Sequence, residues 1–420
     1  MTKILETQIV ESLRNGIPPQ RGVEKYSVGN EKLIEGIKKY HLSQIAEVGK
    51  IRFISGSWGG GKTHFFRIIR DMAFQENCAV SNVELTINSA PLNKFEQVFF
   101  SIVRNISTST YYQEAPSGDV TPIGTVVEES LHKLGGYRRD IGGDLTHEQF
   151  SKAIEILMAN KGIDIDFKKM VQHYWQTYLP EAAEHTAVEQ TRGEILQWFA
   201  GEGTIGAYRK RFGVNKMVSR QNAKLMLQSL AEFVKLAGYN GLMILFDEAE
   251  QSYSIMRKSA LRDAHNNLLS LINNIENIPG IFLIYATTPD FFTDPKHGIV
   301  IYGALAGRIG KPEEKTPKAL DTVWNLDAVV PKLDDYQEVA RRIRGIYIVA
   351  YPEAHNKTAD EDATNRFVKE LNQKHPKLSA VKFWRVMVTA LIRKYDSQME
   401  GEKVATEKIY DDVMERLREE

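Results

Sequence analysis

Eight consecutive residues near the start of the chain have the composition and spacing of a phosphate-binding loop. The stretch Gly56-Ser57-Trp58-Gly59-Gly60-Gly61-Lys62-Thr63 matches the pattern G-x-x-x-x-G-K-[ST] at every fixed position. Glycines let the backbone curl so that its N–H groups point at phosphates, the lysine reaches the β- and γ-phosphates, and the threonine hydroxyl ligates Mg²⁺. We therefore expect nucleotide to be bound by Gly56, Ser57, Trp58, Gly59, Gly60, Gly61, Lys62, Thr63 and His64, with Lys62 also catalytic and Thr63 also a metal ligand.

Two acidic residues follow a second stretch that suits the same chemistry. Residues 241–246 are continuously apolar, which is typical of a strand buried on both faces of a parallel sheet, and Asp247 and Glu248 come directly after them. Carboxylates at this end of a strand lie in the crevice where α/β sheets bind ligands. We expect Asp247 to hold Mg²⁺, directly or through water, and Glu248 to be the catalytic base that orients and activates a water molecule.

Two further positions carry weaker signals. The apolar run 281–286 ends in Thr287-Thr288-Pro289, where the side chain of Thr288 would lie beside the γ-phosphate or the attacking water, or would simply form a Thr-Pro turn. Val28 and Gly29 precede a helix expected at residues 32–40, where they would contact the adenine or form a plain surface turn. The sequence leaves both alternatives open. We keep Thr288 as a candidate catalytic residue and Val28 and Gly29 as candidate nucleotide contacts.

The elements that position these residues are strands alternating with helices. The patterns predict strands at residues 51–55, 79–87, 241–246, 281–286 and 323–326, and a helix over residues 64–74 directly after the loop. Between the second and third strands, residues 107–218 consist mostly of helical pieces broken by Gly and polar loops. The expected division is therefore an N-terminal linker with the first part of a P-loop ATPase domain (1–106), an inserted helical subdomain (107–218), the second part of the ATPase domain (219–330) and a C-terminal all-α lid (331–420).

A short basic run lies inside the expected insert. Tyr208-Arg209-Lys210-Arg211-Phe212 places three cations between two aromatic residues, a combination that suits a nucleic-acid backbone. Runs of this length also occur as solvated helix faces, so both interpretations stay open.

The overall composition excludes several classes of protein. Among 420 residues, 54 Lys and Arg balance 54 Asp and Glu, so no global positive field demands a nucleic-acid partner. The single Cys78 offers neither a disulfide nor a metal cluster, which suits a reducing compartment. The chain has no signal-peptide core and no apolar run near the roughly 20 residues that span a bilayer. We expect a cytoplasmic protein that does not contact membranes.

The order of strands, carboxylates and helical tail is similar to that of the AAA+ P-loop ATPases, and several stretches are more specific. They are Arg14-Asn15-Gly16-Ile17-Pro18-Pro19, the loop continued into His64-Phe65, Gly238-Tyr239-Asn240-Gly241-Leu242 with Asp247-Glu248-Ala249-Glu250 after it, and Tyr302-Gly303-Ala304-Leu305-Ala306-Gly307-Arg308. Together they resemble the BREX-type ATP-binding proteins of bacterial and archaeal phage defence, especially the smaller stand-alone members, over about residues 13–391.

The resemblance implies an AAA+-like α/β fold with a parallel five-stranded sheet in the order 5-1-4-3-2, ATP and Mg²⁺ as cofactors, and a homo-oligomer. It implies that Arg308 is an arginine finger for a neighbouring subunit, with Arg341 and Arg342 of the lid as weaker candidates or as surface salt-bridge residues. Relatives tend to show Pro-Arg before an aromatic residue, whereas this chain has Ala380-Val381-Lys382-Phe383-Trp384-Arg385. Lys382 or Arg385 would then replace the lid arginine that senses nucleotide.

Two functions compete on this basis. The first is an oligomeric ATPase that acts on or near double- or single-stranded DNA. The second is a nucleotide-dependent scaffold or switch that recruits other defence proteins, a helicase, methyltransferase or nuclease, with little turnover. Glu248 favours hydrolysis, whereas the changed lid residues favour the switch. The long insert and the helical lid weigh against a P-loop kinase, and the sequence has no Asn-Lys-x-Asp that would indicate GTP.

Overall fold

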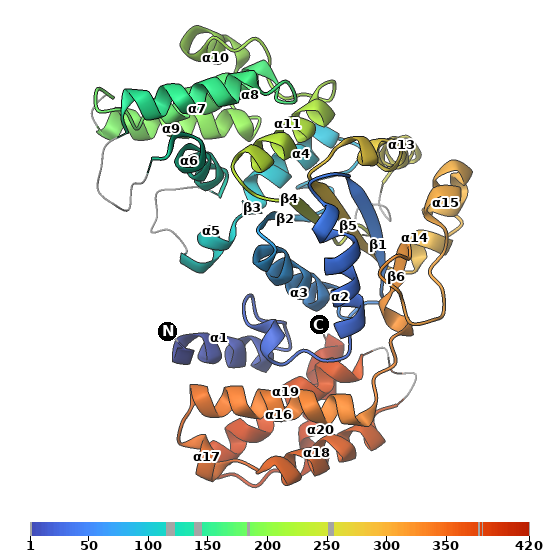
Figure 1. The fold of residues 1–420 in the computed structure, drawn as a ribbon. Coiled ribbons are helices and arrows are strands. Elements are labelled where there is room, and N and C mark those ends of the chain that lie inside the picture. Colours follow the sequence, from blue (N-terminus) through green and yellow to red (C-terminus); the bar gives the residue numbers. More distant parts are fainter. Residues whose placement is uncertain are drawn as a thin grey trace.

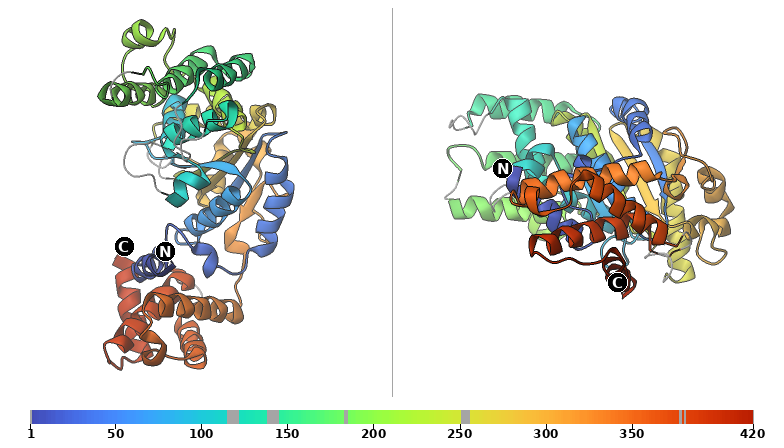
Figure 2. Two further views of the ribbon diagram at one scale, coloured as in Figure 1. Left: turned by 60° about the vertical axis from the view of Figure 1, so that its left-hand side comes forward. Right: turned by 90° about the horizontal axis from the view of Figure 1, so that it is seen from below.

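The computed structural model describes residues 2–114, 122–137, 145–182, 185–250, 256–376, 379 and 381–419. Figure 1 shows a sheet with flanking helices in the middle of the molecule, one group of helices beyond it at the top and another at the bottom. The left view of Figure 2 shows the same arrangement, with the two helical groups at opposite ends.

The central sheet has six strands in the order β3-β2-β4-β5-β1-β6. The strands are β1 (Lys50–Ser55), β2 (Cys78–Glu84), β3 (Ile106–Ser107), β4 (Gly241–Asp247), β5 (Ile281–Thr287) and β6 (Val323–Asn325). All neighbouring pairs are parallel except β2 and β3, which are antiparallel. Parallel strands end at the same edge, so the residues that follow β1, β4 and β5 are brought together there.

The predicted five-stranded, wholly parallel sheet was wrong in strand number, and the six-stranded order differs because an antiparallel edge strand is added, while the five predicted strands keep the order 5-1-4-3-2. The additional strand β3 consists of two residues and pairs with β2 at the edge of the sheet. Its physical origin is the extended backbone at Ile106, which ends helix α4 (Phe95–Asn105) and turns the chain back along β2. The other five strands lie in the order β6-β1-β5-β4-β2.

The two central strands are buried on both faces, which explains their continuous apolar character. Along β4, Met243 and Leu245 pack on one side of the sheet, and Leu242, Ile244 and Phe246 pack on the other. The first side is covered by α2 (Glu31–Tyr40) and α3 (Lys62–Gln75), and the second by α4, α11 (Ala223–Leu236) and α13 (Lys258–Asn274). The sheet and the helices that cover it therefore form a three-layer α/β/α arrangement.

The chain between β3 and α11 forms the upper helical group of Figure 1. Its helices are α5 (Ser109–Glu114), α6 (Pro122–Gly135), α7 (His147–Ala159), α8 (Ile165–Gln176), α9 (His185–Phe199) and α10 (Ile205–Phe212). Buried Phe167, Trp175 and Trp198 belong to the same apolar cluster as the sheet residues of β4. The inserted helices are thus packed onto the sheet layer through a continuous core.

The lower helical group contains both ends of the chain. It is built from α16 (Leu333–Ala350), α17 (Ala354–Lys357), α18 (Glu361–Lys374), α19 (Phe383–Met399) and α20 (Thr406–Glu419). Helix α1 (Thr2–Arg14) packs against α16 and α19, and its Ile9, Val10 and Leu13 are buried in the same apolar cluster. An ion pair of 2.7 Å between Arg14 Nε and Asp396 Oδ2 reinforces this contact.

Short elements complete the fold. They are α14 (Asp290–Thr293), α15 (Gly303–Ile309) and the 3-10 turns at Val23–Lys25, Leu42–Gln44, Ile275–Asn277, Ile299–Ile301 and Leu326–Ala328. Within the described ranges, none of the helices has the length and apolarity needed to cross a bilayer.

Candidate nucleotide-binding site

The phosphate-binding loop joins the end of β1 to the first turn of α3. Gly59 and Gly61 have left-handed backbone angles, with φ of 68° and 86°, which side chains of L-residues rarely adopt. A Cβ on Gly60 would lie 2.8 Å from the carbonyl oxygen of Ser57, so this position excludes any side chain. The loop conformation therefore requires the glycines that the motif supplies.

Lys62 lies inside the loop with its side chain nearly buried. Its Nζ donates hydrogen bonds to the carbonyl oxygens of Gly56 at 2.9 Å and Ser57 at 3.4 Å. It also lies 3.7 Å from Glu250 Oε1 and over the ring of Trp58, 5.6 Å from the centroid. Loop carbonyls and one carboxylate thus hold the ammonium group where the motif places phosphates.

Thr63 and Asp247 come together across the crevice from different elements. Thr63 lies in the first turn of α3 and Asp247 ends β4, and the Thr63 hydroxyl donates to Asp247 Oδ2 at 3.2 Å. Burial raises the pKa of the Asp247 carboxyl, and hydrogen bonds from the Glu248 N–H and the Thr63 hydroxyl oppose that shift. A hydroxyl and a carboxylate are hard oxygen donors of the kind that Mg²⁺ takes together with nucleotide phosphates. The residues present therefore fit that ion.

Glu248 and Glu250 extend the carboxylate cluster. Glu248 has a φ of 54°, a left-handed conformation that is uncommon outside glycine and frequent at functional sites. Burial raises the pKa of the Glu248 carboxyl, and the charges of Glu84, Asp247 and Glu250 raise it further. Burial likewise raises the pKa of Glu250. The site therefore favours a bound cation or a proton, and it makes an ionised carboxylate here more basic than one in water.

Thr288 lies at the same edge of the sheet. The preceding Thr287 ends β5, pairs in register with Ser55 of β1 and accepts a hydrogen bond from the Gly56 N–H at 3.1 Å. Thr288 is 4% exposed. The hydroxyls of Ser55 and Thr287 are buried and have no hydrogen-bond partner among the described residues. Thr287, the neighbour of the predicted Thr288, is therefore the residue of this pair that contacts the loop directly, through its carbonyl oxygen.

His64 connects the loop helix to the N-terminal segment. Its Nε2 is 2.8 Å from Ser27 Oγ and its Nδ1 is 3.4 Å from the Tyr26 hydroxyl. Burial lowers the pKa of His64 to about 4, so the ring is neutral at pH 7. The adjoining Val28 is half-buried against the C-terminal helical core, and Gly29 is exposed with a φ of 99°. The segment 26–29 thus lies beside the first turn of α3.

A family comparison now identifies the chain. A family model described as BREX system ATP-binding protein BrxC/D matches residues 2–417. The chain belongs to this family. A comparison with curated proteins found no match. The match extends over nearly the whole chain, so the resemblance predicted from the loop, Gly-Tyr-x-Gly-Leu and Ala-Leu-Ala-x-Arg motifs is confirmed.

The finger candidate of this BREX ATP-binding protein lies on α15. Arg308 is exposed on α15, and it makes no hydrogen bond or ion pair with any residue that the structure describes. Figure 1 shows α15 at one side of the molecule, apart from α3. Tyr302, which precedes α15, stacks on His265 at 6.2 Å and donates to Asn266 Oδ1 at 2.8 Å. The motif around Arg308 therefore fastens α15 to α13.

The lid cations of this BREX protein have different partners. Arg341 and Arg342 both pair with Glu338, at 2.6 and 2.8 Å, so the predicted lid salt bridge is confirmed, and Arg342 also donates to the Ser27 carbonyl oxygen. Arg385 donates to the Gly16 carbonyl oxygen at 3.1 Å. In contrast, Lys382 Nζ lies 3.3 Å from Asp327 Oδ1. Ala380, the first residue of the stretch that differs from the relatives' Pro-Arg pattern, lies outside the described residues.

Sequence reasoning missed two acidic residues at the loop. Glu250 pairs with Lys62, and it stood only two positions after Glu248 in a quoted motif. Asp327 accepts hydrogen bonds from the Ser57 N–H at 2.7 Å and from its hydroxyl at 2.8 Å. Asp327 follows the weakly patterned strand β6, so only the fold brings it to the loop.

The basic run forms helix α10. Tyr208 and Phe212 are buried, and the three cations between them are exposed. Arg211 forms an ion pair with Glu194 and donates to the Thr191 hydroxyl. The aromatic residues are therefore core residues and are not available as stacking platforms for bases.

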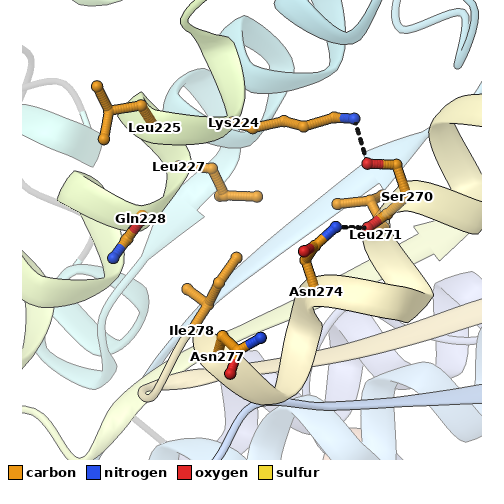
Figure 3. A pocket seen from close by; sticks show the side chains of 9 residues that line it. All are labelled: Lys224, Leu225, Leu227, Gln228, Ser270, Leu271, Asn274, Asn277 and Ile278. Carbon is orange, nitrogen blue, oxygen red and sulfur yellow. Dashed lines mark hydrogen bonds between the residues drawn. The ribbon is translucent and has the colours of Figure 1, made fainter.

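A pocket of about 290 Å³ lies away from the loop, between α11 and α13. Figure 3 shows Lys224 Nζ directed at Ser270 Oγ, a hydrogen bond of 2.7 Å that crosses between the two helices. The pocket contains none of the predicted site residues, and we do not assign the nucleotide to it.

Proposed function

We propose that this BREX ATP-binding protein hydrolyses ATP at the crevice between the loop, β4 and β5. The observation that carries the proposal is the 3.2 Å contact between the Thr63 hydroxyl and Asp247, because it joins the two motifs whose combination defines P-loop ATPases. The buried ammonium of Lys62 lies beside the same crevice. A Gly-rich turn that matched the motif by coincidence would not be expected to lie beside a carboxylate at the end of β4.

The proposed roles follow from position and chemistry. The loop N–H groups and Lys62 bind the phosphates, and Thr63 and Asp247 hold Mg²⁺, which neutralises charge on the phosphates when bound. Glu248 accepts the proton of the attacking water, and the crowded carboxylates around it raise its pKa toward the range that suits a base. Thr288 or its neighbour Thr287 orients that water. The segment at Val28 and Gly29 contacts the adenine.

We further propose that the active form is a homo-oligomer. Arg308 is exposed on α15, and Figure 1 shows α15 apart from α3, whereas an arginine finger must reach the γ-phosphate. A second copy would supply it. In this scheme the protein acts with other proteins of a BREX system, in the cytoplasm and on or near double- or single-stranded DNA.

The ATPase rate of Lys62→Ala tests the site. Without the ammonium, we expect ATP affinity to fall by about 100-fold, because a charge-assisted contact to phosphate in a nearly buried position is lost. Affinity is measured by isothermal titration with a non-hydrolysable ATP analogue, and turnover by phosphate release, each with and without DNA. Lys169→Ala, which removes a lysine of the inserted helices, is the matched control. Unchanged ATP affinity in Lys62→Ala would refute the assignment.

A second candidate function is a nucleotide-dependent scaffold. It is favoured by the ion pair between Lys62 and Glu250, which nucleotide must break, and by the ordinary salt bridges of Arg341 and Arg342 in the lid. In that case ATP binding alone changes assembly. Tight binding combined with a negligible rate at every protein concentration, with or without DNA, would select it.

A further inference from the structure

Asp327 occupies a position between the phosphate-binding loop and the C-terminal helices. Its Oδ2 accepts a hydrogen bond from the Ser57 N–H at 2.7 Å, and its Oδ1 accepts one from the Ser57 hydroxyl at 2.8 Å. The same Oδ1 lies 3.3 Å from Nζ of Lys382, the residue directly before α19. One carboxylate therefore contacts both Ser57 of the phosphate-binding loop and Lys382 at the start of α19.

The loop is shaped to receive these two side chains. A Cβ on Gly60 would lie 3.2 Å from Asp327 Oδ1, and a Cβ on Gly59 would lie 3.9 Å from Lys382 Cγ. Lys382 therefore runs alongside the glycines whose N–H groups face phosphates in loops of this kind. Its side chain is 40% exposed and that of Asp327 is 26% exposed.

The start of α19 is packed against α16, so the backbone of Lys382 should move together with these helices. Phe383, the next residue, packs edge-to-face on Tyr336 of α16, with ring centroids 4.7 Å apart. Trp384 contacts the same tyrosine at 4.3 Å. A displacement of the Lys382 ammonium relative to the loop therefore requires either a rotamer change or a movement of the lid helices as a group.

We propose that Asp327 couples the loop to the lid by holding Lys382 beside the loop until nucleotide phosphates draw the ammonium away from it. An ion pair this exposed is weak, whereas a polyphosphate carries several charges that attract the same cation. Binding then replaces one partner of Lys382 by another and shifts the lid toward the nucleotide. Asp327 is a positioning residue in this scheme, and Lys382 is the lid cation that contacts the phosphates.

The inference rests on the proposed nucleotide site, and its test separates the two. Binding of a non-hydrolysable ATP analogue and of ADP is measured by titration for the wild type, Lys382→Met, Lys382→Arg and Asp327→Asn. We expect Lys382→Met to weaken binding of the ATP analogue about tenfold and binding of ADP by a smaller factor. Lys382→Arg should restore the affinity for the analogue. Asp327→Asn is expected to bind at least as tightly as the wild type. Lys374→Met is the matched control, since Lys374 pairs with Glu407 and Asp411 within the lid.

A second readout follows the lid itself. The single native cysteine, Cys78, is buried, so spin labels on Glu47→Cys and Lys369→Cys report the distance between the sheet layer and the lid. The ATP analogue should shift this distance in the wild type and leave it unchanged in Lys382→Met, and Asp327→Asn should broaden the nucleotide-free distribution. If Lys382→Met keeps both the wild-type affinity and the wild-type distance shift, this inference is refuted while the proposed nucleotide site stands. A wild-type protein that binds no nucleotide would overturn the proposed site as well.

Discussion

At the scale of single residues, the site is a cluster of carboxylates around one lysine. Asp247, Glu248 and Glu250 follow the same strand, and the pKa of each is raised, chiefly by burial. Lys62 Nζ lies 3.7 Å from Glu250 Oε1, and the Thr63 hydroxyl donates to Asp247 Oδ2. Their charged forms are therefore disfavoured by burial, and a cation bound beside them would stabilise those charged forms. This makes Glu248 and Glu250 rival candidates for the base.

Glutamine variants distinguish these two acids. Glu248→Gln should keep nucleotide affinity and lower the turnover rate by about 100-fold or more, because general-base catalysis is lost. Glu250→Gln removes the competitor for the Lys62 ammonium, so it should bind ATP more tightly and retain turnover. Single-turnover phosphate release and ATP titration are the measurements. Full turnover in Glu248→Gln with loss in Glu250→Gln would transfer the role of base to Glu250.

The sequence was most informative for those site residues that stand close together within one short motif. The loop, Asp247 and Glu248 each stand in or directly after a short motif, so a linear pattern was enough to place them on β1, α3 and β4. Glu250 and Asp327 were missed because their roles arise from approach in space, 188 and 265 positions after Lys62 in the numbering, where no periodicity links the residues. The partners of Lys382 and Arg385 likewise became distinguishable only in the fold.

A buried histidine makes stability depend on pH. His41 is buried against Phe282 with its Nε2 2.7 Å from the Ala319 carbonyl oxygen, and burial lowers its pKa to about 4. Between this value and about 6.5, its pKa in an unfolded chain, the folded protein binds fewer protons than the unfolded one, so stability falls as the pH falls. Between pH 7 and pH 5, protonation of His41 in the unfolded chain should lower the free energy of unfolding by about 1–2 kcal/mol.

Urea unfolding at pH 7 and pH 5 measures this dependence. His41→Gln should unfold with a smaller difference between the two pH values than the wild type. His355→Gln, which changes an exposed histidine of α17, should leave the difference unchanged. Equal pH dependence in His41→Gln and the wild type would contradict the prediction.

At the scale of elements, turns decide how the insert and the sheet meet. The Gly-Tyr-x-Gly-Leu motif links α11 to β4: Gly238 has a φ of 94°, and the Tyr239 hydroxyl bonds to Glu129 of α6. Asn240 donates its side chain to the Glu76 carbonyl oxygen at the end of α3. One turn thus ties the insert, the central strand and the loop helix together. The sequence identified this motif but could not show which elements it joins.

Gly238→Ala tests the turn. We expect it to lower the unfolding free energy by about 1 kcal/mol or more, because alanine is strained at positive φ and its Cβ would meet Lys133 side-chain carbons at 3.1 Å. Gly206→Ala is the control, since Gly206 lies in α10 with open space around it and alanine favours helices. Urea denaturation of both variants is the measurement, and equal midpoints would contradict the prediction.

At the scale of the whole molecule, the N-terminal helix and the C-terminal helices pack together in one group. Helix α1 packs with α16 and α19, so the first and last elements share one apolar cluster, and the segment from Val23 to Gly29 then leads past His64 to the sheet. The division into 1–106, 107–218, 219–330 and 331–420 stays a proposal, and the packing of α1 suggests grouping that helix with the C-terminal helices. A movement of the C-terminal helices would therefore also displace α1 and the segment that follows it.

The same scale governs the proposed finger. Because α15 lies apart from α3 and contacts α13 through Tyr302, we expect Arg308 to reach the loop of a neighbouring copy in the proposed ATPase. Arg308→Ala and Lys62→Ala should each lose turnover alone. Mixed in equal amounts, they should recover about a quarter of the wild-type rate, since about one interface in four then joins an intact loop to an intact finger. Phosphate release from the mixture measures the recovery. A finger acting within its own subunit would give none, because every subunit in the mixture then carries a defect.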